Sequence, residues 1–181
     1  MFDLDREYNI PTLYSAFLFL IIAVLLFTMY HVREIRKISW FFAACLFLFL
    51  AVDELMQIHE RLIGPMHQQF GTSGFFYFAW VIPYSIGFII ICLFLFPVFR
   101  NMKTEFQLRF VVAVAVYLSG AVGMEMVGGA YYDHMNGERT LWYELLIGLE
   151  EFLEMLGLTL MIYSLLRLLQ NDRDEFLVRI V

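Results

Sequence analysis

The residues of this sequence with the clearest chemical potential are carboxylates set among apolar residues. Eight acids lie in or beside stretches that are typical of membrane-spanning helices: Asp53, Glu54, Glu60, Glu125, Glu144, Glu150, Glu151 and Glu154. A carboxylate at bilayer depth is costly unless it is protonated, paired or bound to a metal ion. An acid in such a position is therefore a candidate for function.

The chemistry that such a group of acids favours is metal binding. Carboxylates joined by one or two histidines inside a helix bundle are the ligands of dinuclear iron or manganese sites. Zinc accepts the same ligands, and calcium would use the oxygen ligands alone. We expect the metal ligands to come from one set: Asp53, Glu54, His59, Glu60, Glu125, His134, Glu150, Glu151 and Glu154.

The spacing of the two histidines supports this prediction less well than the acids do. The chain lacks the Glu-x-x-His pair of ferritin-like sites. On an ideal helix His59 would lie about 120° around the axis from Asp53. His134 would also lie off the face of Glu125 unless Gly128 and Gly129 break the helix. A haem held by the two histidines is a weaker alternative, because the surrounding acids would disfavour its propionates.

The elements that must position these residues are transmembrane helices. Of the 181 residues, 61% are hydrophobic and 18% aromatic, a composition far from that of a soluble domain. Apolar runs long enough to cross the bilayer lie near 12–30, 39–58, 75–99, 109–132 and 141–168. We therefore expect an all-α bundle of five transmembrane helices that forms a single domain over residues 1–181.

The basic residues predict the orientation of the bundle. Nine of the twelve follow the first, third or fifth run: Arg33, Arg36, Lys37, Arg100, Lys103, Arg109, Arg167, Arg173 and Arg179. Cytoplasmic loops carry an excess of Lys and Arg. We expect the N-terminus outside and the C-terminus in the cytoplasm, which places the acids of the second, fourth and fifth helices together in the outer half of the membrane.

This arrangement favours a metal-dependent membrane enzyme, an oxidoreductase or hydrolase that acts on a lipid-soluble substrate and uses Fe, Mn or Zn. Two alternatives remain: a proton or cation transporter, and an accessory subunit of a membrane complex. Transport is less favoured because the cytoplasmic halves of the runs are almost purely apolar and because no internal repeat is evident. Individual acids can also serve helix packing alone. We expect membrane lipids, a second copy or a larger membrane complex as partners, and no nucleic acid.

Two segments resemble known sequences. The run from Ala51 to Leu62, AVDELMQIHERL, and the run from Glu150 to Gly157, EEFLEMLG, are similar to segments of uncharacterised bacterial multi-pass membrane proteins. The resemblance implies that the acids and the histidine of these two runs belong to one motif set, and that the protein lies in a bacterial inner membrane. It implies no activity.

Overall fold

Every regular element that the structure describes is helical. The computed structural model describes residues 10–33 and 35–180, with side chains described as far as residue 172. The long helices are α1 (Ile10–Val32), α2 (Lys37–Met56), α4 (Val81–Arg100), α5 (Thr104–Leu118), α6 (Glu125–His134) and α7 (Leu141–Ile180). Shorter elements are η1 (Glu60–Leu62), α3 (Ile63–Phe70), η2 (Gly74–Phe76) and the π-helical segment η3 (Ser119–Met124).

Five helical segments in the described residues are long and apolar enough to cross a membrane. They are α1, α2, α4, the continuous run Thr104–His134 made of α5, η3 and α6, and the part Leu141–Asp172 of α7. The prediction of five apolar spans is confirmed. The third span was predicted to start too early, because residues 71–80 form turns and the short η2 before α4 begins at Val81.

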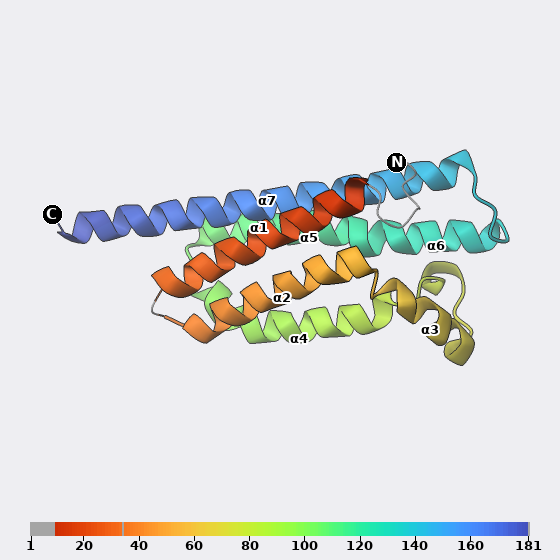
Figure 1. Ribbon diagram of the computed structural model, residues 1–181, viewed down its shortest axis with the longest axis horizontal. Helices are drawn as coiled ribbons and strands as arrows, with labels where there is room; N and C mark the ends of the chain where they lie inside the picture. Colours follow the sequence, from red (N-terminus) through yellow and green to blue (C-terminus); the bar gives the residue numbers. More distant parts are fainter. Residues whose placement is uncertain (1–9, 34, 181) are drawn as a thin grey trace.

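The helices lie roughly along one axis (Figure 1). The first helix, α1, packs against α2 and α7, and α5 packs along α7, while α4 lies beside α2. An apolar core that includes Phe19, Ile22, Met29 and Leu165 fills the bundle between α1, α2 and α7. Many aliphatic side chains, such as Leu93, remain exposed, as expected of helices that face lipid tails.

Two glycines allow α7 to approach the helix formed by α5 and η3 closely. A Cβ atom added to Gly157 would lie 2.5 Å from the backbone nitrogen of Tyr117, and one added to Gly120 would lie 2.7 Å from the carbonyl oxygen of Glu150. Small residues permit such contacts between helices in lipid, where packing drives association. These contacts fix α7 against the segment that carries Glu125.

Most of the described basic residues lie at the end of the bundle where α1 turns into α2 and α4 turns into α5, while Arg61 and Arg139 lie toward the other end. At the turn between α1 and α2, the guanidinium group of Arg33 donates two hydrogen bonds to Asp172 of α7, at 2.6 and 2.7 Å. Residues 1–9 lie outside the described residues. The side chains of Arg173 and Arg179, two of the nine basic residues used to predict the orientation, lie outside them as well.

Candidate functional site

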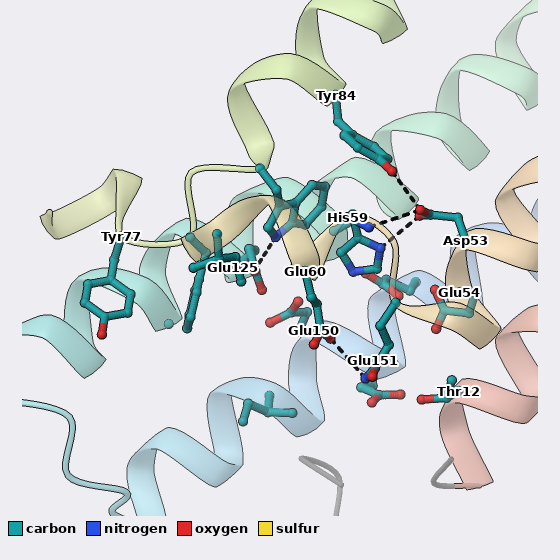
Figure 2. A pocket seen from close by; sticks show the side chains of 18 of the residues that line it. Thr12, Asp53, Glu54, His59, Glu60, Tyr77, Tyr84, Glu125, Glu150 and Glu151 are labelled. Carbon is teal, nitrogen blue, oxygen red and sulfur yellow. Dashed lines mark hydrogen bonds and ion pairs between the residues drawn. The ribbon is translucent and has the colours of Figure 1, made fainter. Parts of the chain in front are cut away.

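A cavity of about 540 Å³ lies at the opposite end of the bundle from the basic turns. Seven carboxylates line it, and they come from α2, η1, α6 and α7: Asp53, Glu54, Glu60, Glu125, Glu150, Glu151 and Glu154. Figure 2 shows acidic side chains from facing helices pointing toward a common space. The sequence-based prediction that these helices bring their acids together agrees with this arrangement.

Asp53 is buried at the wall of the cavity and accepts three hydrogen bonds. The phenol of Tyr84 donates to Oδ1 at 2.7 Å, the backbone N–H of His59 donates to the same oxygen at 3.1 Å, and Nδ1 of His59 lies 2.8 Å from Oδ2. Asp53 is therefore engaged in holding its neighbours. Because Nδ1 of the imidazole is used by Asp53, the Nε2 atom is left for a ligand in the cavity.

The end of α2 explains why His59 reaches Asp53. The helix stops at Met56, and Gln57 adopts a left-handed backbone conformation with φ of 48°. Its N–H donates to the carbonyl of Asp53, and the chain turns so that the next residues fold back over the last turn of α2. The expected separation of about 120° between Asp53 and His59 is wrong, because it assumed a helix that continues through residue 59.

On the other side of the cavity, Glu125 is held by an aromatic residue. The indole Nε1 of Trp80 donates to its Oε1 at 2.7 Å. The segment that carries Trp80 is itself fixed to α6, because Asp133 accepts a hydrogen bond of 2.7 Å from the backbone N–H of Gly74. The Trp80 ring also packs against His59, with centroids 4.7 Å apart.

The helix before Glu125 contains a π-helical segment, η3. A π turn holds an additional residue and rotates everything that follows it relative to a regular helix. The π-helical segment thus sets the direction in which the side chain of Glu125 points from α6. Gly128 and Gly129 do not break the helix, since α6 runs without interruption from Glu125 to His134.

The acids of α7 line the cavity along one helical stripe. Tyr143, Ile147 and Glu154 follow a spacing of three or four residues with either Glu150 or Glu151 between the last two, and all five residues line the cavity from one side of α7. Glu144, one of the eight acids noted in the sequence, does not line the cavity, whereas its neighbour Tyr143 does.

The charges in the cavity act on His59, which lies just beyond α2. Burial disfavours its charged form, but the hydrogen bond to Asp53 and the nearby carboxylates of Asp53, Glu54 and Glu60 outweigh burial and raise the pKa of His59. The cavity therefore favours positive charge. In the observed side-chain positions, no three His, Cys, Asp or Glu residues of the described chain are grouped closely enough to hold a metal ion.

Eight of the nine predicted site residues line the cavity, and His134 does not. His134 ends α6 and is exposed. Sequence reasoning missed several lining residues, including Thr12, Tyr84, Trp80, Tyr117 and Arg139. Their types are common at the ends of transmembrane helices, so only the packing of the helices identifies them.

A family model described as a domain of unknown function, DUF8692, matches residues 1–169. The chain belongs to this family. No curated protein and no solved structure matches it. The match covers the first four apolar helical segments, most of the fifth and every residue that lines the cavity, and the description attaches no activity to them.

Proposed function

We propose that this protein is a metal-dependent membrane enzyme that acts on a lipid-soluble substrate in the acidic cavity. One observation carries the proposal. Seven carboxylates and the imidazole of His59 line a single cavity inside an apolar bundle, and a hydrogen bond to Asp53 orients this imidazole. Carboxylates at membrane depth must be protonated, paired or bound to a cation, and one bound cation would satisfy several of them at once. The volume of about 540 Å³ leaves room for a substrate beside an ion.

The environment of His59 supports a metal ion as that cation. Metal-binding histidines usually donate their second ring N–H to a carboxylate, which fixes the tautomer and the ring orientation. Asp53 stands in this relation to His59. Glu54, Glu60 and Glu151 line the same cavity, and their carboxylates would supply the oxygen ligands beside His59.

The metal would be Fe, Mn or Zn, which these oxygen and nitrogen ligands suit. Such an ion with an open coordination position activates water for hydrolysis or oxygen for oxidation. From the chain itself, His59 and the carboxylates would hold the ion, and Trp80, Tyr84 and Tyr117 would form the aromatic walls for the substrate.

The apolar core between the cavity and the basic end favours a binding site over a transport path. Phe19, Ile22, Leu26 and Met29 of α1 belong to an apolar cluster that fills the half of the bundle toward the basic end. Among the described residues, the buried polar side chain in that half is Ser164, whose hydroxyl donates to the carbonyl of Leu160 in its own helix, so a cation or proton would find almost no polar steps there. Transport and a role as an accessory subunit are therefore the lesser proposals. We also propose that the basic end faces the cytoplasm of a bacterial cell.

Elemental analysis of detergent-purified protein, prepared without chelators, tests the proposal. We expect a near-stoichiometric transition metal in the native protein and at least a tenfold lower occupancy in a variant with Glu54→Gln and Glu151→Gln. Glu144→Gln is the matched control, because Glu144 lies on α7 but does not line the cavity. Absence of metal from the native protein, or equal loss in the control, would contradict a metal site in the cavity.

A further inference from the structure

A second hollow lies at the basic end of the bundle, far from the acidic cavity. Its volume is about 380 Å³, and it is lined by Arg36, Phe96, Pro97, Arg100 and Asn101. Arg36 precedes the first residue of α2, and Arg100 is the last residue of α4. Both arginines therefore lie where an apolar span ends, which is the depth of lipid headgroups.

Among the described residues, Arg36 and Arg100 form no ion pair, unlike Arg33 and Arg109 at the same end of the bundle. Arg33 forms an ion pair with Asp172, and Arg109 donates to Glu105 at 2.7 Å. The guanidinium groups in the hollow are exposed and directed to no such carboxylate within residues 10–33 and 35–172. Two positive charges beside one hollow attract an anion.

The surface next to the hollow is apolar. Ile89, Leu93, Phe96 and Arg100 follow a spacing of four, three and four residues, so they share one face of α4. The first three are 58%, 71% and 54% exposed. An apolar face that ends in an arginine matches a phospholipid, whose acyl chains lie in the membrane and whose phosphate lies at its edge.

We propose that this hollow binds the phosphate of an anionic phospholipid. Guanidinium groups bind phosphate oxygens in pairs of parallel hydrogen bonds, and basic pockets between transmembrane helices bind anionic headgroups. Arg36 lines the hollow from the turn between α1 and α2, where its backbone adopts a left-handed conformation with φ of 56°. The site is separate from the acidic cavity and does not depend on the enzyme proposal.

Native mass spectrometry of the detergent-purified protein with added dioleoyl phosphatidylglycerol tests this site. We expect one tightly bound phosphatidylglycerol on the native protein and little phosphatidylcholine under the same conditions. The variant with Arg36→Gln and Arg100→Gln should bind phosphatidylglycerol at least tenfold more weakly. The variant with Arg36→Lys and Arg100→Lys should retain part of the binding, because the charges remain.

The matched control is Arg109→Gln, which removes a cation at the same end that is paired with Glu105. Equal binding by all variants, or an equal loss in the control, would overturn the proposal. Inorganic phosphate is the second arm. Displacement of phosphatidylglycerol by millimolar phosphate would show that the site binds a free anion, and it would overturn the proposal of a phospholipid site. If the double glutamine variant fails to fold, the single variants Arg36→Gln and Arg100→Gln replace it. Weaker phosphatidylglycerol binding by each single variant would support the proposal, and unchanged binding by both would overturn it.

Discussion

Asp53 is the residue on which the geometry of the acidic cavity depends most. It joins α2 to α4 through Tyr84 and holds the chain that follows α2 through His59. A buried carboxylate that accepts three hydrogen bonds is well compensated, and its removal leaves its donors without an acceptor. Its role in the cavity is therefore to position other groups.

Replacement of Asp53 by Ala should destabilise the protein by about 3 kcal/mol, since a charged acceptor of several hydrogen bonds is lost. Tyr84→Phe, which removes one of these bonds, should cost only about 1 kcal/mol. Unfolding in mixed micelles with increasing SDS, followed by circular dichroism, measures both. Tyr14→Phe on the exposed face of α1 is the control. Equal stability of all three variants would contradict the assigned role of Asp53.

Asp53→Ala also distinguishes a residue that positions His59 from one that binds the metal directly. If Asp53 orients His59, Asp53→Ala should reduce metal affinity by about 10- to 100-fold and not abolish it. Loss of a direct ligand, as in Glu54→Gln with Glu151→Gln, should reduce affinity further. A metal titration of the purified variants compares them. Complete loss with Asp53→Ala at full folding would instead make Asp53 a ligand.

At the residue scale, seven of the eight acids noted in the sequence line one cavity, and they could be noted because a charged residue in an apolar run is visible in the sequence itself. The sequence did not predict that Asp53 holds His59. That contact depends on where α2 ends, and the turn at Gln57 contains neither Gly nor Pro to mark it. Trp80 and Tyr84 were missed for a related reason, since their partners are far away in sequence.

At the scale of the elements, the contact between α5 and α7 determines how the two acidic walls face each other. Gly157 and Gly120 lie at this contact, and each allows one helix backbone to touch the other. Gly120 lies within the π-helical segment η3, which directly precedes Glu125 along the chain. The apolar runs predicted the helices, but neither the π segment nor the crossing point leaves a periodic signal in them.

Gly157→Ala should destabilise the protein by about 1 to 3 kcal/mol, because its new methyl group would meet the backbone of Tyr117. The displaced α7 should also lower metal occupancy. Gly87→Ala on α4 is the matched control, since nothing lies within 4 Å of an added Cβ there. The control should be neutral or slightly stabilised through helix propensity. SDS unfolding of both variants checks this, and equal effects would contradict close packing at Gly157.

Across the whole molecule, charge is divided between two ends: seven carboxylates line the cavity at one end, and basic residues cluster at the turns of the other. The positive-inside rule predicts that the basic end remains in the cytoplasm. Labelling of single cysteines tests this in a background with Cys45→Ala and Cys92→Ala, which removes both native thiols.

The labelling sites are chosen at opposite ends of the bundle. Ser73→Cys lies in the turn before η2 near the acidic cavity, and Thr104→Cys begins α5 at the basic end; both positions are exposed. A membrane-impermeant maleimide should label Ser73→Cys in intact bacterial spheroplasts and Thr104→Cys only after lysis. The reverse pattern would place the acidic cavity on the cytoplasmic side. A substrate would then reach the cavity from the inner leaflet, and the basic hollow would meet the outer one, so this measurement fixes the side of the membrane on which each site acts.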